Sequence, residues 1–165
     1  MTHASRRHAG LSAPAHPRPA AGLLLRYTDQ HGDWYLLGKR HRRLGGAWAN
    51  IGGSLKPGEA ALAGAIREFE EEVAVDSARL ADATITDVIE CGTDRIPYTL
   101  YVVQVLTWFE DAELSWENVA LCWWPADEVD SLPLHGGFAR AWTTLRLLGQ
   151  FDQGRQAPGA SPFVA

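Results

Sequence analysis

The segment from Gly53 to Val75 reads GSLKPGEAALAGAIREFEEEVAV, and its dense part places four glutamates within five consecutive positions, at Glu68 and at 70–72. Like charges this close on a helix repel one another by roughly a few tenths of a kcal/mol per pair. Such a run therefore calls for a positive group against it.

Helical geometry predicts which of these glutamates act together. At about 3.6 residues per turn, Glu68, Glu71 and Glu72 share one face, whereas Glu70 points away. Arg67 precedes Glu71 by four residues and is expected to orient its carboxylate. Small residues above the acidic face leave room for a loop or ligand, and an apolar stripe lies roughly opposite. The small residues are Ala61, Gly64 and Ala65, and the stripe is Leu62, Ile66, Phe69 and Val73.

The residues before the helix predict a loop beside its acidic face. Residues 48–53 read as a short strand entering a glycine turn, in which glycine permits positive φ and close backbone approach. Pro57 and Gly58 are expected to end the loop and start the helix. Backbone groups of such a loop suit a metal and a phosphate. The basic run at 40–43 is either a solvated loop or a phosphate contact.

Composition bounds the remaining possibilities. A chain of 165 residues with 46% hydrophobic content has material for one compact domain. A net charge of −5 argues against binding a nucleic-acid polymer. Cys91 and Cys122 are expected to be reduced, buried thiols, which suits a cytoplasmic protein. Ser5-Arg6-Arg7 lacks the apolar run of an export signal, and no stretch is long enough to span a membrane.

We expect a disordered leader over 1–20, a single domain over 21–149 and a flexible tail over 150–165. Alternating strands and helices predict an α/β fold, with a mixed sheet flanked by helices. The expected strands are 22–27, 34–39, 88–91, 98–108 and a buried strand at 119–124, and 92–97 is expected to be a hairpin turn. The expected helices after 75 are a short one at 125–129 and a longer one at 137–148, whose apolar stripe ends at Leu148.

Taken together, these residues resemble the Nudix box, GX5EX7REUXEEXGU, where U is a bulky apolar residue. Gly53, Glu59 and Arg67 fall at the matching positions, followed by Glu68, Phe69 and the pair Glu71-Glu72. One fixed position departs from the pattern, because Ala74 replaces glycine. At the end of a helix glycine often adopts a left-handed conformation, so alanine there is expected to cost about 1 kcal/mol of stability.

The resemblance implies a Nudix α/β/α sandwich that hydrolyses a pyrophosphate bond in a nucleoside diphosphate linked to another group. It implies that Glu68, Glu71 and Glu72, with the carbonyl of Gly53, bind Mg²⁺, with Mn²⁺ as an alternative. It also implies that Arg67 steadies the catalytic glutamates and that Glu59 braces the loop against the helix.

The general base differs between members of the family and is either a box glutamate or an acid from a later loop. Glu117 is favoured as that acid and as a further metal ligand, because it precedes the strand at 119–124, as in MutT-like members. Glu110 and Glu113 compete with it, and the alternative is an ordinary exposed loop glutamate.

The resemblance favours a small-molecule nucleotide as the substrate, most of all a nucleoside or deoxynucleoside triphosphate of the MutT-like kind. No proline lies between Val75 and Ile96, which argues against the ADP-ribose branch. Alternatives are a nucleotide sugar, ADP-ribose, a dinucleoside polyphosphate or a non-catalytic nucleotide sensor, and a homodimer is a further expectation. Candidate substrate contacts, each with core packing or solvent exposure as the competing interpretation, are Arg42, Trp48, Arg95, Tyr98 and Trp116.

Overall fold

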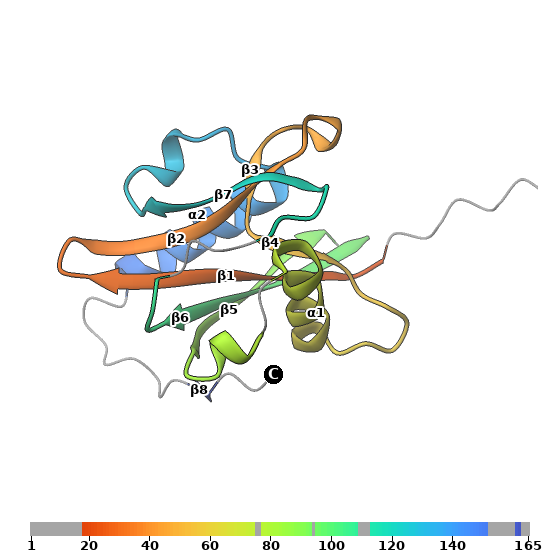
Figure 1. Cartoon of the computed structure of the whole chain (residues 1–165), viewed down its shortest axis with the longest axis horizontal. Coiled ribbons are helices and arrows are strands. Elements are labelled where there is room, and N and C mark those ends of the chain that lie inside the picture. The colour runs from red at the N-terminus through yellow and green to blue at the C-terminus, as the bar shows by residue number, and fades with distance from the viewer. Residues whose placement is uncertain (1–17, 75–76, 94, 109–112, 152–160, 163–165) are drawn as a thin grey trace, which may run out of the picture.

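A mixed sheet forms the centre of the structure, a computed structural model that describes residues 18–74, 77–93, 95–108, 113–151 and 161–162 (Figure 1). Within these residues the sheet has eight strands, and its main path runs β3-β2-β1-β6-β5-β8, while β4 pairs with β1 and β7 with β2. The strands are β1 (Ala20–Asp29), β2 (Gly32–Arg40), β3 (Trp48–Ala49), β4 (Ile51–Ser54), β5 (Thr84–Thr93), β6 (Ile96–Val105), β7 (Asn118–Pro125) and β8 (Ser161–Pro162). Strands β1 and β6 are parallel, and the other pairs are antiparallel.

Two helices cover opposite faces of this sheet, α1 (Ala61–Val73) and α2 (Gly136–Phe151) (Figure 1). Side chains alternate across a strand, so Leu23 and Leu25 of β1 join the core cluster under α1, whereas Leu24 joins the cluster under α2. The three layers confirm the predicted α/β/α sandwich with a mixed sheet between helices.

The apolar stripe predicted for α1 is the face that packs on the sheet. Ile66, Phe69 and Val73 are buried, and Leu62 is partly buried against the same cluster. Full burial of one such side chain stabilises the fold by roughly 1.5–3 kcal/mol. The opposite face of α1 is thereby turned toward the loop that follows β4.

The prediction of a glycine turn at 52–53 is wrong, because Gly52 and Gly53 lie within β4 and pair with Gly22 and Ala21 of β1. Neither has a positive φ. The predicted close approach is confirmed: a Cβ on Gly52 would lie 2.4 Å from the carbonyl oxygen of Ala21, and one on Gly53 would lie 2.5 Å from the Glu68 carboxylate. The positive φ belongs to Gly58, at +75°, and α1 begins after it, at Ala61.

Several predicted boundaries also differ. The helix expected at 125–129 is a 3-10 helix at Val129–Ser131. The strand at 119–124 is not buried throughout, since Val119 is 53% exposed, and Leu148 at the end of the α2 stripe is 48% exposed. Most of the turn expected at 92–97 belongs to β5 and β6. Cys91 and Cys122 are free but only half-buried.

Strand β6 ends at Val105, three residues before the predicted end at Trp108. Trp108 instead packs its ring against Tyr27, Trp34 and Trp123. Trp123 belongs to the core cluster on the α1 side, and Tyr27 and Trp34 are partly buried against it. Trp108 therefore takes part in an aromatic cluster beside the sheet and not in the strand itself.

The chain ends were predicted to be a disordered leader and a flexible tail. Residues 1–17 of the leader and residues 152–160 and 163–165 of the tail lie outside the described residues. The first described strand begins at Ala20, and α2 continues to Phe151. Within the described part of the chain, no helix is long and apolar enough to cross a membrane.

Ala74 is the residue at which the box departs from glycine, and its backbone is left-handed, with φ 48° and ψ 30°. It is the one non-glycine residue with positive φ in the described part of the chain. We predict that Ala74→Gly raises the stability by about 1 kcal/mol, because glycine adopts this conformation without steric cost. For a chain of this length that corresponds to a Tm increase of about 2–4 °C in thermal unfolding.

Ala63→Gly provides the matched control, since Ala63 is an exposed residue inside α1. Glycine in a helix interior costs about 1 kcal/mol, so this variant is expected to melt lower than wild type. A Tm for Ala74→Gly that moves down together with that of Ala63→Gly would contradict the strain at the helix end.

Candidate active site

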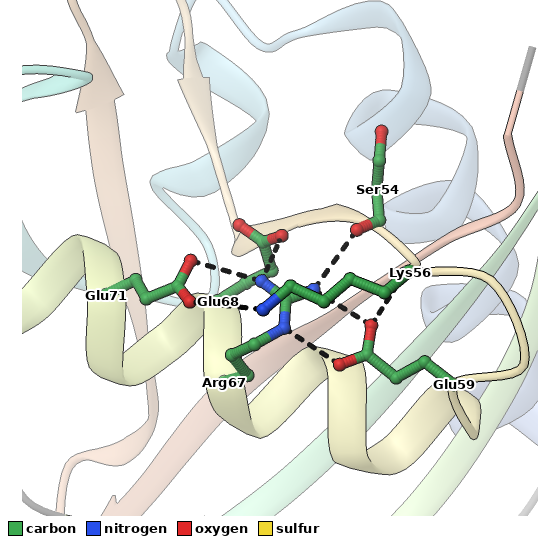
Figure 2. A network of polar contacts seen from close by, with 6 residues as sticks. All are labelled: Ser54, Lys56, Glu59, Arg67, Glu68 and Glu71. Atoms are coloured by element: carbon green, nitrogen blue, oxygen red, sulfur yellow. Dashed lines mark hydrogen bonds and ion pairs between the residues drawn. The ribbon is translucent and has the colours of Figure 1, made fainter.

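The guanidinium of Arg67 is the centre of the polar network on the exposed face of α1 (Figure 2). Its Nε and Nη2 atoms donate to the two carboxylate oxygens of Glu59, at 2.8 and 2.9 Å. Nη1 donates to Glu68 at 2.8 Å and to Glu71 at 3.1 Å, and Nη2 also reaches the carbonyl oxygen of Ser54 at 3.2 Å. The Arg67–Glu71 contact predicted from the spacing is therefore confirmed, within a larger cluster.

Glu59 joins the loop to the helix. Besides its two-point contact with Arg67, it accepts a hydrogen bond from the backbone N–H of Lys56 at 2.8 Å. The Arg67 guanidinium, with the Lys56 N–H as the second contribution, lowers the pKa of Glu59 to about 2. Its carboxylate is only 15% exposed, so the loop before α1 is fixed by a charged pair largely shielded from solvent.

Glu68 lies directly against β4. A Cβ at Gly53 would lie 2.5 Å from its carboxylate, a distance that no real side chain tolerates. A larger residue at position 53 would therefore displace the Glu68 carboxylate from its present place beside the strand. Gly53 and Glu68, which the resemblance assigns to one metal site, are neighbours in space.

Glu72 is a buried carboxylate, 8% exposed. Its Oε2 accepts a 2.6 Å hydrogen bond from Asn118 Nδ2 at the start of β7, and its backbone carbonyl accepts the N–H of Ser115 at 2.9 Å. Burial raises the pKa of Glu72 to about 7, against the hydrogen bond from Asn118, and the charge of Glu117 raises it further. Nearby, the two cations Arg67 and Lys56 pair with the three carboxylates of Glu59, Glu68 and Glu71, so the region carries excess negative charge.

Glu117 is held beside this group by its backbone. Its carbonyl oxygen accepts the N–H of His41 at 2.6 Å, and its own N–H donates to Ser115 Oγ. The charge of Glu117 acts on Glu72, which places it near the box. Of its predicted competitors, Glu113 is exposed, and Glu110 lies outside the described residues.

A cavity of about 250 Å³ opens next to the box on the α2 side of the sheet. Gly52 of β4 lines it, one residue before Gly53, and the charge of Arg40 in its wall acts on Glu72. The cavity is lined by Arg40, Ala49, Asn50, Gly52, Gly92, Thr93, Ile96, Tyr98, His135, Gly137, Phe138 and Arg140. The volume is close to the lower end of the range for small-molecule sites.

Of the residues predicted to contact the substrate, only some line the cavity. Tyr98 lines the cavity, and its hydroxyl accepts a 2.6 Å hydrogen bond from Asn50 Nδ2. Trp48 is 7% exposed and packs against Trp124 in the core. Arg42, Arg95 and Trp116 are exposed on the surface and are not among the described lining residues.

Sequence reasoning missed four described residues of the site. These are Asn118, which holds Glu72, and Asn50, His135 and Arg140, which line the cavity. Arg40, which also lines it, belongs to the basic run that was predicted to be either a solvated loop or a phosphate contact. The partners are far apart along the chain, 46 residues for Glu72 and Asn118 and 48 for Asn50 and Tyr98. Local spacing gives no signal for such pairs.

The donor set can be compared with what a metal requires. Among the described residues, no three or more His, Cys, Asp or Glu side chains are grouped closely enough to form a metal centre. The donor chemistry nevertheless fits a hard divalent cation, since Glu68, Glu71 and Glu72 offer carboxylate oxygens from one helix and Gly53 lies directly beside the Glu68 carboxylate. The uncompensated negative charge around Arg67 and the buried Glu72 both favour bringing in a cation.

Comparison with known proteins places this arrangement in context. A family model described as the NUDIX domain matches residues 16–148. Proteins of two strains of Mycobacterium tuberculosis, both named "Putative 8-oxo-dGTP diphosphatase 3", are 36% identical over 150 residues, which span 83% of this chain and 68% of theirs.

Solved structures give the same picture. RenU, a Nudix hydrolase from M. smegmatis, is 27% identical, with a TM-score of 0.68 over 81% of this chain and 86% of that chain. A C. elegans Ap4A hydrolase is 21% identical, with a TM-score of 0.64 over 82% of this chain and 98% of that chain. At that identity the second similarity concerns the fold alone.

Substitution of Glu59 tests whether its ion pair with Arg67 stabilises the loop against the helix. Its pKa is lowered from 4.5 to about 2 in the folded protein, so its contribution to stability is present above pH 4.5 and is lost as the pH falls toward 2. We predict that Glu59→Gln lowers the Tm at pH 7 and that its difference from wild type shrinks below pH 4.5. Glu70→Gln, at an exposed position of the same helix, is the control. An equal Tm deficit at pH 7 and pH 2.5 would count against the ion pair.

Substitution of Glu72 tests how much folding stability is lost when this buried carboxyl group ionises. Its pKa is raised from 4.5 to about 7, so ionisation destabilises the metal-free fold as the pH rises through this interval. With divalent cations chelated, Glu72→Gln is predicted to be more stable than wild type at pH 8, by an amount on the order of 2 kcal/mol. The gain should vanish near pH 4, and urea unfolding at both values measures it. A variant less stable than wild type at pH 8 would show that burial does not penalise this charge.

Proposed function

The chain belongs to the Nudix family, and on that premise we propose that it is a Mg²⁺-dependent pyrophosphohydrolase of nucleoside or deoxynucleoside triphosphates. The chain is a hydrolase that acts on phosphorus-containing anhydrides. The observation that carries the proposal is the carboxylate cluster around Arg67, next to a cavity near the size of a small-molecule site.

The metal ligands in this proposal are the carboxylates of Glu68, Glu71 and Glu72, the carbonyl of Gly53 and, from the neighbouring loop, the carboxylate of Glu117. When bound, Mg²⁺ neutralises the diphosphate, lowers the pKa of a bound water and stabilises the charge that develops on the leaving phosphate. Mn²⁺ has similar oxygen-ligand preferences and is expected to substitute for it.

In this proposal the protein's own residues orient the carboxylates and take a proton from the attacking water. Arg67 fixes the carboxylates of Glu68 and Glu71 through charge-assisted hydrogen bonds, so they need little reordering. Asn118 holds Glu72 in the same way. A carboxylate takes the proton of the water that attacks phosphorus, and the P–O bond of the pyrophosphate breaks. We assign this role to Glu117, with Glu68 or Glu71 as the alternative.

The nucleotide part of the substrate is proposed from two features. The relatives at 36% identity are named as 8-oxo-dGTP diphosphatases, which supports a purine deoxynucleoside triphosphate. The cavity lined by Asn50, Tyr98 and Phe138 lies next to the carboxylates, so a nucleoside bound there would present its phosphates to them. Arg40 is the last residue of β2, Arg42 begins the 3-10 helix just after it, and both are suited to anionic phosphate.

A non-catalytic sensor is the less favoured function, because the chain retains every carboxylate of the box. A substrate panel tests the alternative substrates, which are a dinucleoside polyphosphate, ADP-ribose and a nucleotide sugar. The panel contains dNTPs, 8-oxo-dGTP, Ap4A, ADP-ribose and UDP-glucose with Mg²⁺, and phosphate release is measured before and after added phosphatase. The cytoplasmic location and the homodimer predicted from the sequence stay predictions.

The role of the carboxylates is tested by Glu71→Gln and Glu72→Gln, each of which removes one charge at nearly constant size. We predict that either variant lowers kcat on the best triphosphate by at least about a hundredfold, because ligands of the metal stabilise the transition state. Glu70→Gln, on the same helix but pointing away, should keep kcat within about threefold of wild type. Turnover like that of wild type in both ligand variants would refute the assignment.

A further inference from the structure

The side chain of Tyr98, on β6, reaches across β1 to the strand that carries Gly53. In the sheet β1 lies between β4 and β6, and Gly22 of β1 is paired with Gly52 of β4. A Cβ on Gly22 would lie 2.3 Å from the Tyr98 hydroxyl oxygen and 2.5 Å from the carbonyl oxygen of Ile51. The hydroxyl therefore occupies space over β1 that glycine leaves open.

Asn50, which lies between β3 and β4, joins this hydroxyl to β4. Its Nδ2 donates to the Tyr98 hydroxyl at 2.6 Å and to the carbonyl oxygen of Ile51 at 3.1 Å. Asn50 is buried, so these bonds compete little with water. Burial raises the pKa of Tyr98 to about 12, so the hydroxyl keeps its proton and is neutral at pH 7. A neutral pair of hydrogen bonds thus connects β6 with the backbone of β4.

Two consecutive glycines, Gly52 and Gly53, leave β4 without side chains of its own beside the box. Because glycine has more conformational freedom than any other residue, such a strand depends on its neighbours to stay in place. A Cβ on Gly52 would lie 3.0 Å from the Tyr98 hydroxyl oxygen, whereas one on Gly53 would lie 2.5 Å from the Glu68 carboxylate. Successive residues of a strand face opposite sides of the sheet. Tyr98 therefore contacts β4 on the side opposite to Glu68.

We infer that Tyr98 and Asn50 are positioning residues of the proposed metal site, because they hold β4 in the place where the Gly53 carbonyl and the Glu68 carboxylate bind one cation. This inference rests on the proposed function, since it takes Gly53 and Glu68 as metal ligands. Tyr98 acts in it from behind the strand, and not through the substrate contact that the sequence predicted.

Tyr98→Phe tests this role, because it removes the hydroxyl and keeps the ring. Asn50 Nδ2 then loses one of its two acceptors, and β4 loses its connection with β6. The Kd of the nucleotide-free protein for Mn²⁺ is expected to rise about tenfold, since residues that orient metal ligands typically contribute this much to affinity. The electron paramagnetic resonance signal of free Mn²⁺ measures the Kd.

Asn50→Ala tests whether the two residues act as a pair. It removes both hydrogen bonds of the amide and should also raise the Kd for Mn²⁺ about tenfold. If the residues act through one contact, the double variant has a Kd within about twofold of that of Asn50→Ala. Two effects that multiply in the double variant would overturn the pairing.

Tyr35→Phe is the matched control, because it also removes the hydroxyl of a buried tyrosine. The Tyr35 hydroxyl bonds to Arg26, and the residue is not among those that line the cavity. Its loss should lower the Tm but keep the Kd for Mn²⁺ within about twofold of wild type. An equal loss of Mn²⁺ affinity in both tyrosine variants would be a general effect of stability and would overturn the inference.

Hydrogen exchange in the metal-free protein gives a readout that does not depend on a bound ion. The amide hydrogens of β4 should exchange about tenfold faster in Tyr98→Phe than in wild type, because the strand opens more often without its support. Those of β2 should change much less, and Tyr35→Phe should leave β4 as it is in wild type. Unchanged exchange of β4 in Tyr98→Phe would overturn the inference.

Mn²⁺ binding without nucleotide separates this inference from the function on which it rests. Weaker binding in Tyr98→Phe, together with faster exchange of β4, supports the positioning role even if wild type hydrolyses no triphosphate, which would reject the proposed function only. A raised KM for the triphosphate with an unchanged Kd for Mn²⁺ would make Tyr98 a substrate contact and overturn the inference alone. A wild-type protein that binds no Mn²⁺ would overturn both.

Discussion

The contact of Arg67 with three carboxylates is the constraint on which the active-site region depends. Its planar fork pairs with both oxygens of Glu59 and leaves Nη1 for Glu68 and Glu71. A lysine could not supply this geometry, because it offers a point charge at the end of a flexible chain. The same guanidinium therefore fixes the loop before α1 and the acidic face of the helix in one arrangement. Arg67 and Lys56, whose Nζ lies 3.9 Å from a Glu71 carboxylate oxygen, do not balance the carboxylates of this region, which include Glu72, and the remaining negative charge is what a cation is proposed to neutralise.

A second set of contacts joins distant segments to the end of α1. Ser115 and Asn118 bond to the backbone and side chain of Glu72, and His41 bonds to Glu117. These bonds bring the β2 end, the loop before β7 and the helix to one place. This arrangement lowers the stability of the fold, because it buries the carboxylate of Glu72 and burial raises the pKa of that group. A group that opposes folding in the metal-free protein, and that is proposed to bind a cation in the active one, is typical of sites where stability is lost for function.

The sequence predicted those features that depend on local spacing. The apolar stripe of α1, the Arg67–Glu71 contact and the left-handed position of Ala74 all follow from helix geometry, and all are present. The role of the glycines before the helix was predicted only in part, because close approach to Glu68 depends on how α1 packs on β4. Asn118, Asn50 and the cavity rim were missed, since strand pairing and helix packing bring them to the site. No periodicity connects residues of different elements, so their meeting is a property of the fold.

The most direct test of this account is a crystal structure of the protein soaked in Mn²⁺, with the anomalous signal used to locate the ion. We predict a peak beside the carboxylates of Glu68, Glu71 and Glu72 and the carbonyl oxygen of Gly53, at about 2–2.3 Å from the oxygens that bind it. Arg67 should remain paired with Glu59 in that structure. No peak at the box, or a peak elsewhere while Glu68 and Glu71 stay bound to Arg67 alone, would contradict the claim that these carboxylates form a metal site.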